Sequence, residues 1–340
     1  MQKMFTAFLV LAMVCALALT GQAAQKTYTV KIAHVLSETD DAHQGYLALR
    51  KMLEERSGGR FKVQIFPNAT LGATDEEHYE LVNTDVIQIY LCGTFSFPNF
   101  NKDLAYFGVM DLPFLFRTDA EYYAFVDSEY GKKMFEDMLR ITGNVLVTTS
   151  FLRSWHSLTT TKVPVHVPAD MKNLKILSQS PKVFQSTVAA WGGNVTSIPF
   201  AEIYTAMQQG AVDGHLRPIN LHISQRFYEV QKYVTVVNQC AMVVCSLLSN
   251  KFVESLPPDL KEIFFTSLEE YEQIMRKYGE TRQELSVKHM ADSGLTVIIP
   301  TPEQKQQWIE ASQSVYAEME ERIGKEVIAK AKEIIAPLRK

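Results

Sequence analysis

The sequence lacks the features that mark several large classes of protein. Its 340 residues include 4 cysteines at irregular spacing, which excludes a disulfide-built scaffold and a cysteine-rich zinc motif. Ordinary glycine (16) and proline (13) counts, with 46% hydrophobic positions, exclude a collagen-like or disordered chain. A net charge of −4 argues against nucleic acid or an anionic membrane surface as the main partner. A globular protein long enough for two domains remains.

Motifs of the common enzyme classes are also missing. No GxGxxG segment opens a helix, and there is no GxxxxGK[ST], GxSxG or HExxH. Only His215 and His222, seven residues apart, could share a helix face, and such a pair is more often structural than metal-binding. Because no nucleophile and base come together, we expect neither an enzyme nor a bound metal or other cofactor.

The only apolar run of membrane-related length stands at the N-terminus. Lys3 precedes an apolar stretch from Phe5 to Leu19, which suits a signal peptide and is short for a membrane span. Segment 21–24 offers small residues for cleavage, and a membrane anchor is the less favoured alternative. The residues before Cys15 lack the small side chain expected beside a lipidated cysteine. We therefore expect residues 1–24 to be a cleavable export signal.

Export would leave an odd number of cysteines, namely Cys92, Cys240 and Cys245. An odd number cannot pair completely in an oxidising compartment. The last two lie in one apolar run, and on a strand their spacing of five would put them on opposite faces. We expect all three to be small buried hydrophobic residues.

Strand-like and helix-like segments alternate along the chain, which indicates an α/β protein. We expect strands at 28–34, 61–66, 86–91, 144–149, 174–177, 234–248 and 295–299. We expect helices at 41–57, 75–83, 119–139, 181–191 and 200–209, and two more within 303–335.

The longest expected element is a helix that opens in segment 255–259, where proline is tolerated in the first turn. Apolar residues follow one helical face from Leu260 to Tyr278, and the pattern continues to about His289. Roughly 30 residues at 1.5 Å each give about 45 Å. Such a helix exceeds the diameter of one small domain, so we expect it to lie across two.

Six segments form an ordered set over essentially the whole mature chain. They are FPNATLG (66–72), DLPFLFR (111–117), KVPVHVPADMKNLKI (162–176), PFAEIYTAMQQGAVDG (199–214), FYEVQK (227–232) and LPPDL (256–260). Together they resemble the substrate-binding proteins of TRAP transporters, the tripartite ATP-independent periplasmic transporters of the DctP-like family. The fourth segment is the most specific.

This resemblance implies a two-lobed periplasmic-binding-protein fold of α/β type, with hinge strands and the long helix spanning both lobes. We expect lobe I at 25–153, with 243–281 returning to it. Lobe II is expected at 154–242, with 282–340 packing on lobe II and across the hinge. Ligand binding would close the lobes. In the periplasm, the closed protein would then deliver its ligand to a small and a large integral membrane subunit.

The sequence departs from the family at three positions that the resemblance places at the ligand. A typical member has an arginine where this chain has His156, and a principal, carboxylate-gripping arginine where it has Leu177. It has an asparagine where this chain has Arg217. Because an anion offsets the desolvation of a buried guanidinium, we expect the cationic anchor to have moved to Arg217. Alternatively, Arg217 faces solvent or pairs with an acid, or Arg153 is the anchor.

The resemblance also implies the other ligand contacts. Trp155, His156, Leu177 and Phe200 would form an apolar and aromatic wall, with Phe200 where the family places a ring over the ligand. A protonated His156 would make affinity depend on pH near its reference pKa of about 6.5. Weaker expectations rest on four residues at strand ends or loops that face the cleft in the family: His34, Thr94, Ser180 and Asn238.

The leading hypothesis is therefore an exported solute-binding protein for a small organic anion. The ligand would be a carboxylate or sulfonate with an aromatic or weakly polar body. A second hypothesis keeps the fold but makes Arg217 structural, so that the ligand is neutral or cationic. A third, an exported enzyme, is opposed by the missing motifs. A fourth, a ligand-sensing subunit of a signalling receptor, is not separated from transport by the sequence.

Overall fold

The computed structural model describes residues 26–179, 181–198 and 200–339. Its strands are β1 (Tyr28–Ala33), β2 (Phe61–Phe66), β3 (Ile89–Gly93), β4 (Val145–Thr160), β5 (Lys175–Leu177), β6 (Asn194–Thr196), β7 (Gly214–Pro218), β8 (Tyr233–Thr235), β9 (Ala241–Ser249) and β10 (Thr296–Ile298). The α-helices are α2 (Asp41–Arg56), α3 (Asp75–Asn83), α4 (Phe97–Phe100), α5 (Asp119–Val126), α6 (Glu129–Thr142), α7 (Lys182–Ala190), α8 (Ile203–Gln208), α9 (Ile219–Ser224), α10 (Asn250–Ser255), α11 (Pro258–Asp292), α12 (Pro302–Ala311), α13 (Gln313–Ile323) and α14 (Lys325–Ile335). Short 3₁₀ turns are η1 (Thr94–Ser96), η2 (Lys102–Asp111), η3 (Pro168–Met171), η4 (Phe200–Glu202), η5 (Phe227–Glu229) and η6 (Ala336–Arg339).

All of these strands join one sheet, whose order is β2-β1-β3-β9-β4-β7-β5-β6. Off this path, β8 pairs with β4, and β10 pairs with β8. The long strand β4 belongs to both halves of it. From Val145 to Trp155 it pairs antiparallel with β9, and from His156 to Thr160 it pairs antiparallel with β7. We call the half with β1, β2, β3 and β9 lobe I, and the half with β5, β6, β7, β8 and β10 lobe II. The two-lobed α/β fold expected from the sequence is confirmed.

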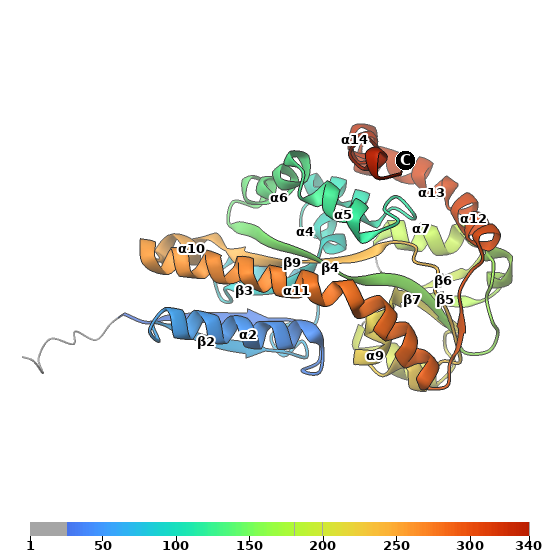
Figure 1. Cartoon of the computed structure of the whole chain (residues 1–340), viewed down its shortest axis with the longest axis horizontal. Helices are drawn as coiled ribbons and strands as arrows, with labels where there is room; N and C mark the ends of the chain where they lie inside the picture. Colours follow the sequence, from blue (N-terminus) through green and yellow to red (C-terminus); the bar gives the residue numbers. More distant parts are fainter. Residues whose placement is uncertain (1–25, 180, 199, 340) are drawn as a thin grey trace, which may run out of the picture.

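Helix α11 runs the length of the molecule across both lobes (Figure 1). Its 35 residues measure about 52 Å at 1.5 Å each. Its first half packs on α2 in lobe I, and near its end Met290 packs with Ile219 in lobe II. At Gly279 a Cβ atom would lie 2.9 Å from the carbonyl oxygen of Leu152 on β4, so only glycine allows this close crossing. The expected long helix is confirmed.

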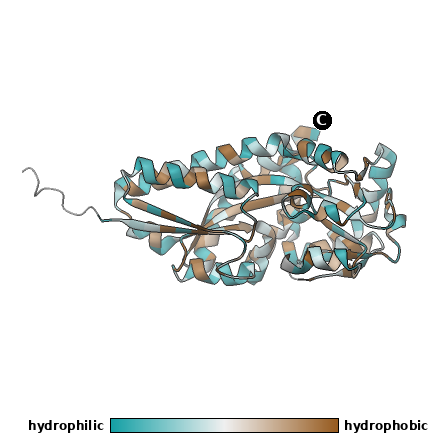
Figure 2. Cartoon of the chain, turned by 90° about the horizontal axis from the view of Figure 1, so that it is seen from below, coloured by the Kyte–Doolittle hydropathy of each residue, from teal (hydrophilic) through white to brown (hydrophobic). Residues whose placement is uncertain are grey.

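Lobe I has an apolar core on each face of its sheet. The α5–α6 core lies on one face and includes Phe97, Phe107, Tyr122, Phe125, Met138 and Leu247. The α2–α11 core lies on the other and includes Tyr46, Leu49, Phe61, Phe264 and Tyr271. Lobe II has three smaller clusters. Apolar strands lie inside and the helices turn hydrophilic faces outward (Figure 2).

The C-terminal helices bridge the lobes. In lobe II the ring of Trp308 on α12 meets Trp191 edge-on at 4.7 Å. In lobe I, Met319 of α13 and Ile328 of α14 belong to the α5–α6 core. The chain therefore returns to both lobes after α11, and it ends on lobe I (Figure 1).

Several element boundaries differ from those expected. The helix expected at 119–139 is two helices, because Ser128 caps a new one by accepting a hydrogen bond from Gly131 N. The strand expected at 234–248 is interrupted where Asn238 takes a left-handed backbone (φ 50°). Three C-terminal helices replace the expected two. The strand expected to end at residue 149 continues to residue 160.

Cys92, Cys240 and Cys245 are all buried, as expected. The expected export signal lies outside the described residues. Over the part of the chain that is described, no helix combines the length and apolar character needed to cross a membrane.

Candidate functional site

Arg217 is a partly buried cation at the junction of the lobes. It lies on β7 opposite Ser157 of the crossing strand β4, and its guanidinium carbon is 5.6 Å from the ring centre of Phe200. Its Nε atom is buried without a hydrogen-bond partner, and no carboxylate of the described residues lies within 4.0 Å of its guanidinium nitrogens. Burial lowers the pKa of Arg217 to about 10, and the charge of Asp75 acts in the opposite direction. The guanidinium remains charged at neutral pH and lacks a counter-anion.

Two residues of the expected apolar wall, Leu177 and Phe200, lie on elements next to β7, which carries Arg217. Leu177, at the end of β5, is fully buried in a lobe II cluster with Ile203 and Phe227. Phe200 packs against that cluster and also against the α2–α11 core of lobe I. The aromatic ring beneath Arg217 therefore touches both lobes.

His156 is also fully buried, on β4. Its Nδ1 lies 3.2 Å from the carbonyl oxygen of Cys240, its Nε2 lies 2.8 Å from Oε1 of Gln179, and its ring stacks on Phe184 at 5.2 Å. Burial lowers its pKa to about 4, and hydrogen bonding to Gln179 only partly offsets this. This lowered pKa argues against the expected change of charge near pH 6.5.

The side chains of Trp155 and Asn238 form hydrogen bonds where the chain crosses between the lobes. The Trp155 indole donates to Oδ1 of Asp119 (2.8 Å), and its ring belongs to the α5–α6 core. Asn238 accepts a hydrogen bond from Gln283 of α11 (3.0 Å), and Gln283 in turn accepts one from Trp155 N (3.2 Å). Both side chains already have partners within the protein.

Arg153, the alternative anchor, is neutralised inside the protein. Its Nη2 lies 2.6 and 2.7 Å from the two carboxylate oxygens of Asp40, and both side chains are at most 2% exposed. Burial would raise the pKa of Asp40, but the Arg153 guanidinium holds it below its usual value. Arg282 of α11 pairs with the neighbouring Asp41 at 2.7 Å. Arg153 therefore differs from Arg217, because the protein itself supplies its counter-charge, Asp40.

Three expected ligand contacts remain: His34, Thr94 and Ser180. His34 Nε2 lies 3.1 Å from His43 Nδ1, and burial lowers the pKa of His34 to about 4. Thr94, at the start of η1, has a buried hydroxyl without a hydrogen-bond partner. Ser180 lies outside the described residues.

Sequence reasoning missed three polar groups, which lie on β4, directly after β5 and on α3. The hydroxyls of Ser157 and Ser178 are buried without hydrogen-bond partners. The third is Asp75, the first residue of α3, whose carboxylate accepts hydrogen bonds from Tyr90 and Ser96. The run of acids 75–77 suggested only a favourable first turn, and nothing in it distinguished the member that faces inward.

Comparison with known proteins agrees with this architecture. The profile of the family described as "Bacterial extracellular solute-binding protein, family 7" (DctP) matches residues 32–322. The chain belongs to this family. The C4-dicarboxylate-binding periplasmic protein DctP of Vibrio cholerae is 30% identical over 309 residues, covering 89% of each chain. The 2,3-diketo-L-gulonate-binding periplasmic protein YiaO of Escherichia coli is 26% identical over 271 residues, covering 79% of this chain and 80% of that one.

Solved structures of solute-binding proteins have the same fold as this chain. A TRAP periplasmic solute-binding protein of Shewanella oneidensis with bound succinate has a TM-score of 0.84 and 26% identity, covering 91% of this chain and 99% of that one. One from Desulfovibrio salexigens with bound orotic acid has a TM-score of 0.82 and 25% identity, covering 92% and 99%. Family 7 comprises solute-binding proteins rather than enzymes.

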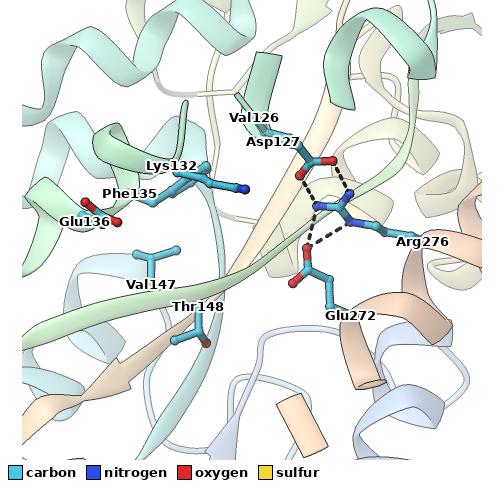
Figure 3. Close-up of a pocket in the computed structure, with 9 residues that line it drawn as sticks. All are labelled: Val126, Asp127, Lys132, Phe135, Glu136, Val147, Thr148, Glu272 and Arg276. Carbon is cyan, nitrogen blue, oxygen red and sulfur yellow. Dashed lines mark hydrogen bonds and ion pairs between the residues drawn. The ribbon is translucent and has the colours of Figure 1, made fainter. Parts of the chain in front are cut away.

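This family 7 protein also has a surface pocket away from Arg217. The pocket has a volume of about 300 Å³ and lies between α6, β4 and α11 (Figure 3). Arg276 on its wall pairs with Asp127 (2.7 Å) and Glu272 (2.7 Å). Because Arg276 is paired with two acids, this pocket offers no unpaired guanidinium. Lys132 also lines it.

Proposed function

We propose that this chain is the extracytoplasmic solute-binding component of a TRAP transporter. It binds a small organic anion between the lobes, with Arg217 as the cationic anchor. The single observation that carries the proposal is the partly buried guanidinium of Arg217, whose Nε atom is enclosed without a partner and which has no counter-anion among the described residues. An unpaired buried charge is costly, and an anionic ligand offsets that cost. A neutral or cationic ligand would leave it uncompensated.

The neighbours of Arg217 favour a particular ligand body. Phe200 lies against the guanidinium, and the stacked pair His156 and Phe184 lies on the adjoining strand and helix. These rings offer flat apolar surfaces, and His156 contributes no charge at neutral pH. We infer a carboxylate or sulfonate with an aromatic or weakly polar body. Relatives with bound succinate and orotic acid support a carboxylate.

Membership of the family supports delivery of the ligand to membrane subunits. The ligand-loaded, closed protein would dock onto a small and a large integral membrane subunit after export through the N-terminal signal. A periplasmic location is supported by curated relatives that are periplasmic binding proteins.

A binding experiment tests the anchor. Purified protein is screened by thermal shift against carboxylates, sulfonates and their neutral amides, because a ligand that binds only the folded state raises the melting temperature. Affinities of the hits are then measured by calorimetry. Arg217→Ala should weaken anion binding by at least about 100-fold, since a charge-assisted bidentate contact is lost. Arg217→Lys should lose less, because it keeps the charge without the planar fork.

The matched control is Arg226→Ala. Arg226 is an exposed lobe II arginine paired with Glu229 (2.5 Å), and its loss should leave affinity unchanged. Equal affinity of the Arg217→Ala protein and the wild type, or equal binding of the neutral amides, would contradict the proposal.

A further inference from the structure

Asp75 is a second inward-facing charge, and it belongs to lobe I. It is the first residue of α3, which packs on β3 and β9. Its neighbours Glu76 and Glu77 are exposed, and they bond Asn99 and the Ala73 N–H. Asp75 alone turns inward, where it accepts hydrogen bonds from the Tyr90 and Ser96 hydroxyls.

These bonds leave Asp75 without a counter-charge. A carboxylate has about four acceptor positions, and two hydroxyls occupy two of them. Within the described chain, no lysine, arginine or histidine nitrogen lies within 4.0 Å of this carboxylate. The nearby His78 stacks on Tyr90 at 4.4 Å but bonds the carbonyl oxygen of Thr74 through Nδ1 (2.9 Å). Burial raises the pKa of Asp75.

The segment that holds Asp75 also meets the Arg217 side of lobe II. Ser96 ends η1, whose Phe95 ring lies edge-on to Phe184 of α7 at 6.2 Å. Phe184 stacks on His156, which directly precedes the β4 residue opposite Arg217. At the start of η1 the buried Thr94 hydroxyl has no partner. Asp75 is also the charged group whose field acts on the Arg217 guanidinium.

We propose that Asp75 is a specificity-determining residue that faces the bound ligand opposite Arg217, so that the ligand is an anion that also carries a hydrogen-bond donor. This inference rests on the proposed function, because it takes Arg217 as the anchor of the anionic group. A hydroxyl or ammonium group on the ligand would satisfy the free acceptor positions of Asp75. A second carboxylate there would face a like charge at low dielectric, which is strongly unfavourable. The site therefore selects hydroxy or amino monocarboxylates over plain dicarboxylates such as succinate.

Matched probes test this inference. One series is phenylacetate, mandelate and 4-hydroxyphenylacetate, which share a ring and a carboxylate and differ in a hydroxyl group. The aliphatic series is 4-methylpentanoate, 2-hydroxy-4-methylpentanoate and leucine, and succinate completes the set. In wild-type protein, at least one donor-bearing member should bind tenfold or more tightly than the donor-free member of its series and than succinate.

The Asp75→Asn variant should reduce that preference at least tenfold, mainly by weakening the donor-bearing probe. Ser96→Ala is the matched control, because it removes one hydrogen bond to Asp75 and keeps the carboxylate, so the preference should persist. A purely structural role for Asp75 would lower stability in both variants without changing the ratio of affinities.

The outcomes separate this inference from the proposed function. If Arg217→Ala abolishes binding but Asp75→Asn leaves the preference unchanged, the anchor stands and the role of Asp75 is overturned. If Arg217→Ala leaves binding unchanged, the proposed function itself fails. Binding of no probe, or binding of succinate as tightly as the donor-bearing probes, also overturns the role of Asp75.

Discussion

At the residue scale, the most informative contrast is between the buried Arg153 and the partly buried Arg217. Arg153 has Asp40 as a built-in counter-charge, whereas Arg217 has no acid within ion-pair distance among the described residues. The sequence favoured Arg217 as the anchor and kept Arg153 as the alternative, but it could not show which of them has a counter-charge. Asp40 stands 113 residues before Arg153, and no local pattern reports a contact that distant. The same limit applies to Asp75, whose inward direction depends on Tyr90 and Ser96.

Buried neutral histidines predict a fall in stability with acidity. Burial lowers the pKa of His222 to about 3, whereas in the unfolded chain it is about 6.5. The unfolded state therefore takes up a proton as pH falls below about 6.5, and the folded state does so only near pH 3. Stability is lost across this window, by on the order of 2 kcal/mol at pH 5 for this residue.

Urea unfolding at pH 7 and pH 5 checks this prediction. His222→Gln should reduce the difference between the two unfolding free energies by about that amount. The exposed His166 provides the control, because His166→Gln should leave the difference as it is. A pH difference that is the same in the His222 variant and the wild type would refute the argument.

At the scale of elements, periodicity predicted most of the helices and strands, but it did not predict where β4 ends. Helix α2, strand β2 and helix α3 begin where expected, because their apolar spacing and capping residues are local. The length of β4 was missed because its lobe II half mixes serine, threonine and histidine with apolar residues. Those polar residues lie beside β7 and β8, which the sequence alone does not place next to them.

Asp40 links two elements, and this predicts a large loss on its substitution. It caps α2 by accepting a hydrogen bond from Ala42 N (2.9 Å), and it neutralises Arg153 on β4. Asp40→Asn keeps the shape and a capping oxygen but leaves a buried arginine uncompensated. We expect the free energy of unfolding to fall by about 3–5 kcal/mol in denaturant titrations.

A double variant separates the charge effect from packing. Asp40→Asn combined with Arg153→Met removes both charges and should recover a substantial part of the lost stability. A double variant as unstable as the sum of its single variants would show that the ion pair is not the cause.

At the scale of the whole molecule, the sequence predicted the two lobes and the long shared helix correctly. The sequence predicted two helices at the C-terminus, whereas the structure has three short ones there, and they pack on both lobes. Which side chains meet between the lobes depends on how β4 crosses, and this explains why the fold was more predictable than the site.

The shared elements predict one cooperative unfolding transition. Because β4 and α11 each pack in both lobes, neither lobe keeps its core when the other unfolds. Differential scanning calorimetry should give a single peak whose calorimetric and van't Hoff enthalpies agree. Saturation with a ligand found in the screen should move that peak upward as a unit. Two resolved peaks, or a ligand shift confined to part of the transition, would contradict this expectation.

The repeated crossing of the chain between lobes also has a consequence for how such proteins diversify. The backbone passes from lobe I to lobe II along β4, returns along β9, and reaches lobe II again through α11. A single genetic crossover therefore cannot exchange one whole lobe for another. New ligand preferences are therefore expected to arise by substitutions within an intact frame, on neighbouring strands such as β5 and β7.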